Sequence, residues 1–249
     1  MSELQHPYSR SFESIAEVYE RVRPGYPKAA VSWLAEKLPI DSRTIVLDLG
    51  AGTGKLTREL LPFAGRVIAL EPGPAMLTQL ERAVPEAEPL LGAAEAIPLG
   101  AASVDAVVCG QSFHWFRQDE ALAEIRRVLK PGGRLGLIWN LRDDADEFQR
   151  EVTTLFQPFV PEGRKGPRES VAPLVAPELV GEVEKAVFPF QHELDADGVV
   201  DRMSSTSFVA SAPDLLRRAF FANLRAAVAA RGGRVAFRYT TEVYVTAVA

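Results

Sequence analysis

The sequence contains one cysteine and three histidines among its 249 residues. The single cysteine, Cys109, excludes an intramolecular disulfide and a cysteine-rich zinc site, so the composition gives no sign of an oxidising compartment. The histidines, His6, His114 and His192, lie far apart and show no spacing typical of metal ligands. We therefore expect no bound metal.

Long apolar runs and blocks of like charge are also absent. No segment approaches the length of about eighteen uncharged apolar residues that a membrane helix needs, and the first residues lack a secretory signal pattern. The formal net charge is −5, whereas tight nucleic-acid binding needs a concentrated basic face. We expect a soluble, cytoplasmic protein without a nucleic-acid or membrane partner, and the oligomeric state stays open.

The chain does contain a regular alternation of short apolar runs and helical patterns between residues 43 and 140. This alternation indicates βαβ units around a parallel sheet, and the length fits one doubly wound α/β domain. Two further strands and a helix over 213–231 are expected in the tail. The segments expected as strands are 44–49, 66–70, 87–91, 104–109, 135–139, 184–191 and 240–248.

The most informative segment is the turn after the first expected strand. Gly50, Gly52 and Gly54 occupy alternate positions where a buried strand gives way to a helix. Glycine at such positions permits positive φ and lets a ligand approach the backbone. In an open α/β sheet, ligands bind in the crevice at the carboxyl ends of the strands. We expect a ligand site here, and a turn without a ligand is the alternative.

The spacing of the glycines indicates which ligand binds. A dinucleotide fingerprint would need its third glycine where Lys55 stands, one residue after Gly54. Asp48 would repel a pyrophosphate but favour an ammonium group. Glu71, 21 positions after Gly50, ends the second expected strand, where a carboxylate can accept hydrogen bonds from both ribose hydroxyls. A ribose and a cationic amino-acid group describe S-adenosylmethionine better than a dinucleotide.

This turn, within residues 46–54, resembles the first motif of the class I (Rossmann-like) S-adenosylmethionine-dependent methyltransferases. Segments 71–76 and 92–99 are similar to their second and third motifs, and 104–108 and 128–133 to the fourth motif and the approach to the fifth strand. The resemblance implies a mostly parallel seven-stranded sheet in the order 3-2-1-4-5-7-6, with helices on both faces. It also implies an N-terminal helical cap and an insertion after the fifth strand.

A looser resemblance to the trans-aconitate-methyltransferase-like group of small-molecule enzymes covers nearly the whole chain. It rests on Phe12, Ala16, Tyr19, Arg23, Pro24, Tyr26, Pro27, 111–116, 139–142 and 204–207. In that group the N-terminal helix covers the cofactor, and the substrates vary. We expect a single domain, 1–249, divided into a cap (1–42), a cofactor-binding core (43–140), an insertion or lid (141–183) and C-terminal strands and helices that complete the sheet (184–249).

The resemblance and the motif chemistry together give the expected site. The expected cofactor contacts are Tyr19, Arg23, Asp48, Gly50, Ala51, Gly52, Thr53, Glu71, Pro72, Met76, Ala94, Glu95 and Gln111. Many relatives carry an acidic residue where Ala93 stands, so the adenine amino contact would fall to Glu95 or to the backbone. Arg23 is expected to bind the methionine carboxylate, with a surface ion pair as the alternative. The expected acceptor contacts are His114, Trp115, Asn140 and Arg142.

Methyl transfer from a sulfonium needs chiefly a held near-attack geometry and the exclusion of water. His114 is the candidate catalytic residue, because an unperturbed pKa of about 6.5 suits a general base, and the sequence leaves open whether it is a base or has a structural or orienting role. Two other functions remain: an NAD(P)-dependent oxidoreductase, which fits the glycine spacing poorly, and a non-catalytic S-adenosylmethionine-binding protein. The sequence identifies neither the acceptor nor the atom that is methylated.

Overall fold

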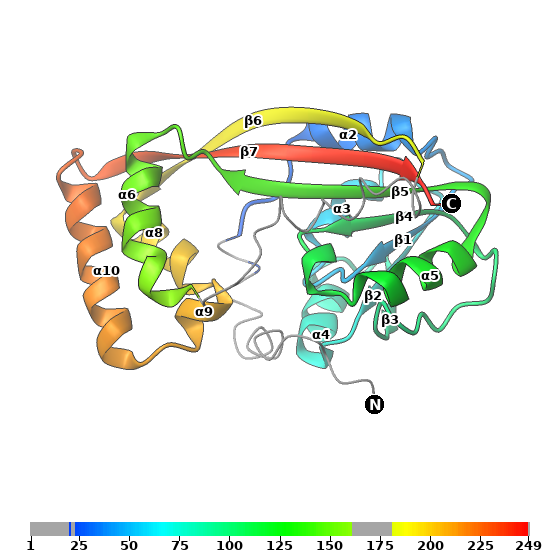
Figure 1. Ribbon diagram of the computed structural model, residues 1–249, viewed down its shortest axis with the longest axis horizontal. Helices are drawn as coiled ribbons and strands as arrows, with labels where there is room; N and C mark the ends of the chain where they lie inside the picture. The colour runs from blue at the N-terminus through cyan, green and yellow to red at the C-terminus, as the bar shows by residue number, and fades with distance from the viewer. Residues whose placement is uncertain (1–19, 21–22, 161–180, 249) are drawn as a thin grey trace.

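The computed structural model describes residues 20, 23–160 and 181–248. These residues are built on one seven-stranded sheet, whose strands are drawn as arrows in Figure 1. The strand order is β3-β2-β1-β4-β5-β7-β6. The first five strands pair in parallel, and β7 is antiparallel to both β5 and β6. The strands are β1 (Ile45–Leu49), β2 (Arg66–Glu71), β3 (Glu88–Leu91), β4 (Val104–Gly110), β5 (Leu129–Arg142), β6 (Glu184–Asp195) and β7 (Arg234–Ala247). The predicted fold class and strand order are confirmed.

Helices cover both faces of the parallel half of the sheet. The helices are α2 (Lys28–Lys37), α3 (Lys55–Leu60), α4 (Pro74–Ala83), α5 (Gln118–Val128), α6 (Glu147–Phe156), α8 (Ala196–Ser204), α9 (Ser207–Ala210) and α10 (Asp214–Ala229), with 3-10 turns η2 (Phe113–Trp115) and η3 (Gln157–Phe159). Leu47 of β1 packs in one core with Leu122 of α5, whereas the adjacent Val46 packs in another with Leu34 of α2. Because successive strand residues face opposite sides, a strand covered on both faces is apolar throughout.

The first four strands begin and end within two residues of their expected bounds, but the last three are longer. β5 extends from Leu129 to Arg142 rather than over 135–139, and β7 begins at Arg234 rather than at Thr240. Continuous antiparallel pairing joins β7 to both neighbours, from Arg134–Ala247 through Arg142–Tyr239 on one side and to Asp195–Arg234 on the other. Cross-strand hydrogen bonds therefore extend these strands beyond their apolar stretches.

A second group of helices lies at the far end of the long strands (Figure 1). Helices α6, α8, α9 and α10 share one apolar core with β7, which includes Phe148, Val152, Val199, Phe220 and Phe237. We refer to these helices as the helical lobe. Helix α6 belongs to the expected insertion, whose residues 161–180 lie outside the described part of the chain, yet it packs on α10 from the C-terminal part. No helix in the described residues could cross a membrane.

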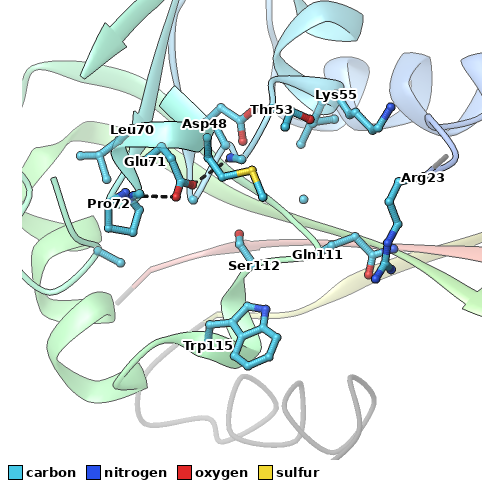
Figure 2. A pocket seen from close by; sticks show the side chains of 18 of the residues that line it. Arg23, Asp48, Thr53, Lys55, Leu70, Glu71, Pro72, Gln111, Ser112 and Trp115 are labelled. Atoms are coloured by element: carbon cyan, nitrogen blue, oxygen red, sulfur yellow. Dashed lines mark hydrogen bonds between the residues drawn. The ribbon is translucent and has the colours of Figure 1, made fainter. Parts of the chain in front are cut away.

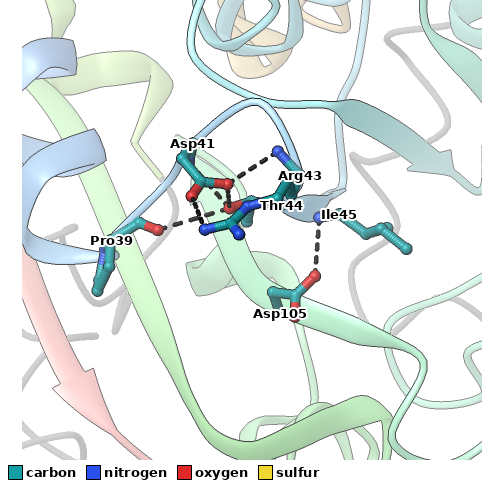
Figure 3. A network of polar contacts seen from close by, with 6 residues as sticks. All are labelled: Pro39, Asp41, Arg43, Thr44, Ile45 and Asp105. Atoms are coloured by element: carbon teal, nitrogen blue, oxygen red, sulfur yellow. Dashed lines mark hydrogen bonds and ion pairs between the residues drawn. The ribbon is translucent and has the colours of Figure 1, made fainter.

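A polar network stabilises the start of the parallel sheet, at the edge away from the strand ends that carry the glycine turn (Figure 3). The Asp105 carboxylate accepts a hydrogen bond from the backbone N–H of Ile45 at 2.8 Å and another from Lys130 Nζ at 2.8 Å. Asp41 accepts hydrogen bonds from the backbone N–H of Arg43 and from the Thr44 hydroxyl. Asp105 thus bonds the first residue of β1 directly to β4.

Replacing Asp105 tests that role. Asp105→Ala should lower the free energy of unfolding by about 1 to 3 kcal/mol, because the Ile45 N–H loses a charged acceptor. Lys130→Ala removes only a partly exposed ion pair and should cost about 0 to 1 kcal/mol. Urea denaturation measures both values. Equal losses in the two variants would contradict a special role for the Ile45 hydrogen bond.

Candidate functional site

A pocket lies at the carboxyl ends of the central strands (Figure 2). Its wall is formed by the turn after β1 (Gly50–Thr53), the turn after β2 (Glu71–Gly73) and the end of β4 with the following segment (Gly110–Ser112). Each of these segments follows a parallel strand, so the sheet itself brings them to one edge. Residues from the helical lobe and from the segment before α2 line the opposite side.

The turn after β1 has the backbone that its glycines predict. The φ angles of Gly50, Gly52 and Gly54 are +71°, +59° and +85°, all in the left-handed region. A Cβ on Gly50 would lie 2.7 Å from the Ser112 Cβ, so only glycine fits there. A Cβ on Gly52 would meet no described atom within 4 Å, because that residue borders open space.

The N–H groups of this turn are bonded within the protein. The N–H groups of Gly50 and Ala51 both donate to the carbonyl oxygen of Leu70 in β2, at 2.8 and 3.0 Å. The Gly52 N–H donates to Glu71 Oε2 at 2.9 Å. A phosphate site needs backbone N–H groups that point at the ligand. These three successive N–H groups point at β2 instead, which disfavours a pyrophosphate at this turn.

Glu71 is held in one orientation at the end of β2. Its Oε2 accepts the Gly52 hydrogen bond, and its Oε1 accepts a hydrogen bond from the Gly73 N–H at 2.9 Å. The side chain is buried yet still lines the pocket. Each carboxylate oxygen can accept more than one hydrogen bond. Glu71 can therefore accept additional bonds from ligand hydroxyl groups.

Asp48 is a buried carboxyl group with one unused oxygen. Its Oδ2 accepts a hydrogen bond from the Thr57 hydroxyl at 2.6 Å, whereas Oδ1 has no hydrogen-bond partner among the described residues. Burial raises the pKa of Asp48 to about 7, against the opposing effect of the Thr57 hydrogen bond. Because Asp48 also lines the pocket, a cationic ligand group beside Oδ1 would favour its charged form.

The pocket gathers nearly all the expected cofactor contacts. Twelve of the thirteen line it: Arg23, Asp48, Gly50, Ala51, Gly52, Thr53, Glu71, Pro72, Met76, Ala94, Glu95 and Gln111. The thirteenth, Tyr19, lies outside the described residues. Glu95 also accepts a hydrogen bond from the Arg117 N–H at 2.8 Å, and the Gln111 amide donates to the carbonyl oxygen of Asn140 at 3.1 Å.

The segment before α2 connects the glycine turn to the helical lobe. Glu20 accepts a hydrogen bond from the Thr53 hydroxyl at 2.6 Å and forms an ion pair with Lys55 at 3.3 Å. Arg23 donates from Nε to the Ser205 hydroxyl and from Nη2 to the Ser205 carbonyl oxygen, at 3.0 and 2.9 Å. In this structure Arg23 therefore bonds to the lobe from the edge of the pocket.

The expected acceptor residues take different positions. Trp115 lines the pocket, but His114 is not among the described residues that do so; its ring lies 4.8 Å from that of Trp115. The Asn140 amide donates to the Gly25 carbonyl oxygen at 2.9 Å and accepts from the Thr241 hydroxyl at 2.7 Å. The two polar groups of Asn140 thus bond the end of β5 to the segment before α2 and to β7.

Two arginines lie beside each other where the long strands meet the helical lobe. Arg142, at the end of β5, lies over the ring of Phe156, and its Nη1 is buried without a hydrogen-bond partner among the described residues. Burial lowers the pKa of Arg142, and the positive charge of Arg202 lowers it further. Arg202 is 8% exposed, donates to the Tyr239 hydroxyl at 2.8 Å and lines the pocket.

Lys55 and Arg202 also line the pocket, although neither was predicted to do so. Lys55 directly follows the glycine turn, so its place in the sequence was a usable signal. Arg202 is separated from that turn by about 150 residues and sits in a helix without a local motif. Groups of acidic, histidine and cysteine side chains that could hold a metal ion do not occur in the described part of the chain.

The raised pKa of Asp48 predicts a pH-dependent cost in stability. Because the folded pKa of about 7 exceeds the ordinary value of 3.8, the fold becomes less stable as pH rises between those values, and the loss is complete above the folded pKa. Asp48→Asn removes this cost. Its stabilising effect should grow by about 2 kcal/mol between pH 5 and pH 7 and change little above pH 8. Urea denaturation at each pH measures it, and a pH-independent difference would contradict the prediction.

Known proteins resemble this chain over most of its length. A family model described as a methyltransferase domain matches residues 47–137. An uncharacterized methyltransferase of Mycobacterium tuberculosis is 41% identical over 211 residues, which cover 84% of this chain and 82% of the relative. An uncharacterized methyltransferase-like protein of Schizosaccharomyces pombe is 36% identical over 206 residues, which cover 82% of this chain and 80% of the relative.

A solved structure described as a type II methyltransferase, from Anaeromyxobacter dehalogenans, is also similar. It shares 27% sequence identity and a TM-score of 0.68, and the match covers 91% of this chain and 97% of that one. The matched family segment contains the glycine turn, Glu71 and the end of β4, which together form the strand-end wall of the pocket. The narrower trans-aconitate-methyltransferase-like group stays a prediction. By its sheet, its motifs and these relatives, the chain belongs to the class I S-adenosylmethionine-dependent methyltransferases.

Proposed function

We propose that this enzyme methylates a small-molecule acceptor in the cytoplasm and that the pocket at the strand ends holds both cofactor and acceptor. The main support is the pairing of two buried carboxyl groups, Asp48 and Glu71, around a glycine turn whose first three N–H groups are already bonded. The acidic balance of the chain favours a small acceptor over a nucleic acid.

The residues present fit S-adenosylmethionine. Glu71 would accept hydrogen bonds from the ribose hydroxyls, because Gly52 and Gly73 already fix both of its oxygens. The unused Oδ1 of Asp48 would accept from the ammonium group. Ala94 and Glu95 would border the adenine. The N–H bonds of the turn favour this ligand over a nicotinamide dinucleotide, because a pyrophosphate would find no N–H donors at Gly50, Ala51 or Gly52.

The protein's part in the reaction is to position the methyl donor and the acceptor and to enclose them away from water. S-adenosylmethionine supplies, when bound, a methyl group on a positively charged sulfur, which is already activated for transfer. Trp115 and Phe116 line the pocket and present apolar surface that excludes water. Gly50 lets Phe116 approach the turn closely, because a Cβ there would lie 3.2 Å from the Phe116 ring. We propose that catalysis rests mainly on this held geometry.

Label transfer tests the small-molecule acceptor. The full chain is incubated with methyl-labelled S-adenosylmethionine and a cell extract that has been separated by size into small molecules and macromolecules. We expect label in the small-molecule fraction, and we expect one S-adenosylhomocysteine to form for each methyl group transferred. Asp48→Asn is the matched control, because it keeps the side-chain shape and should reduce transfer by weakening cofactor binding. Label found only in the macromolecular fraction would overturn the proposal.

A further variant tests the expected base, His114. A general base would make His114→Ala about 10²- to 10⁴-fold slower and would remove a limb of the pH profile of kcat/KM. Because His114 lies against Trp115 and outside the pocket-lining residues that the structure describes, we expect it instead to position the Trp115 ring. His114→Gln should then keep kcat and the pH profile and change mainly KM. A large loss of kcat in both variants, together with a lost pH limb, would establish the base.

A further inference from the structure

The pocket is divided into an acidic side and a basic side. Asp48 and Glu71 lie on the strand-end side, and Figure 2 shows Arg23 across the pocket from them. Lys55 and Arg202 also line the pocket. The acidic side suits the cationic and hydroxyl groups of the cofactor, so the basic side is available to an anionic group.

Arg202 and Arg142 both neighbour Tyr239, and of the two only Arg202 is among the described residues that line the pocket. Arg142 is the cross-strand neighbour of Tyr239 in the pairing of β5 with β7. Arg202 donates a hydrogen bond from Nε to the Tyr239 hydroxyl, and its guanidinium lies 5.7 Å from the centre of that ring. The guanidinium of Arg142 lies 5.4 Å from the centre of the Phe156 ring. Aromatic rings thus fix both guanidinium groups in place.

Ion-pair partners for these two cations do not occur in the part of the chain that the structure describes. Neither Arg142 nor Arg202 forms an ion pair with a carboxylate among the described residues, whereas Lys55 in the same pocket is paired with Glu20. The carboxylate whose charge acts on Arg142 is Asp144, an exposed residue. Burying a cation without a partner is costly, so two adjacent arginines of this kind indicate a ligand that supplies the missing negative charge.

We propose that Arg142 and Arg202 form an anion subsite that binds a carboxylate group of the methyl acceptor. This inference rests on the proposed function. A carboxylate fits because each guanidinium presents a planar fork of donors that matches its two oxygens. The Nη1 of Arg142 and the terminal nitrogens of Arg202 remain for this purpose, because the Tyr239 hydrogen bond uses only Nε. The cofactor's own carboxylate falls to Lys55, which directly follows the glycine turn, and to Arg23, which lies across the pocket from Glu71.

A binding experiment tests the subsite without any methyl transfer. The melting temperature of the full chain, saturated with S-adenosylhomocysteine, is measured with glutarate, with its neutral analogue glutaramide and with inorganic phosphate. Glutarate should raise the melting temperature by about 2 °C at a concentration ten times its Kd, and glutaramide should not. The shift should disappear in Arg142→Met/Arg202→Met and persist in Arg218→Met, an exposed arginine of the same lobe. Equal shifts in all three proteins, or a shift from phosphate alone, would overturn the proposal.

A second experiment separates this inference from the proposed function. Small molecules from the extract are divided by anion exchange at neutral pH, and each fraction is offered as methyl acceptor. We expect transfer only to the retained fraction, with kcat/KM about 10- to 100-fold lower in Arg142→Met/Arg202→Met and an unchanged Kd for S-adenosylhomocysteine. Transfer to the unretained fraction would refute the subsite but not the function, and no transfer to any small molecule would refute the function.

One outcome would assign the arginines to another role, and a second variant covers the case in which the first does not fold. A loss of S-adenosylhomocysteine affinity of tenfold or more in the double variant would place them on the cofactor, which overturns the proposal. If the methionine variant does not fold, Arg142→Lys/Arg202→Lys keeps both charges but loses the planar fork. That variant should bind glutarate more weakly than the wild type, and undiminished binding would refute recognition by the guanidinium groups.

Discussion

The hydrogen bonds from the glycine turn to β2 are the constraint on which the site depends. The N–H groups of Gly50 and Ala51 donate to Leu70, and the N–H of Gly52 donates to Glu71. These bonds occupy the first three N–H groups of the turn, which would otherwise be available to a phosphate, and they fix the Glu71 carboxylate at the end of its strand. They require left-handed backbone, which explains glycine at positions 50 and 52. One local geometry therefore both disfavours a dinucleotide and holds the Glu71 carboxylate at the pocket wall.

The rest of the pocket follows from where the long antiparallel strands end. β5 and β7 extend past the parallel sheet and carry the helical lobe, and their paired residues Arg142 and Tyr239 lie beside Arg202 of that lobe. The parallel half supplies carboxylates to the pocket, and the lobe supplies a guanidinium group. The proposed anion subsite at the lobe would keep an anionic acceptor apart from the cationic methyl donor.

The sequence predicted the fold, and it predicted which strand-end residues line one pocket, because both depend on local patterns. The contacts among Gly50, Gly52 and Glu71 lie within one βαβ unit, where strand, turn and helix are readable from about thirty residues. The lengths of β5 and β7 depend on pairing between distant segments, and Arg202 reaches the pocket only through the packing of the lobe. The position of Asn140 in the sequence was not enough to predict its contacts. It follows the fifth expected strand, yet both of its polar groups bond other parts of the protein.

The most direct test of this account is calorimetric titration of the full chain with S-adenosylhomocysteine in the presence of a chelator, with NADH titrated in parallel. The account predicts metal-independent binding of S-adenosylhomocysteine at one site and no binding of NADH. It also predicts that Glu71→Ala weakens the binding of S-adenosylhomocysteine by about 10- to 100-fold, because a charged acceptor for the ribose is lost. Binding of NADH without binding of S-adenosylhomocysteine, or an unchanged Kd in Glu71→Ala, would contradict the account.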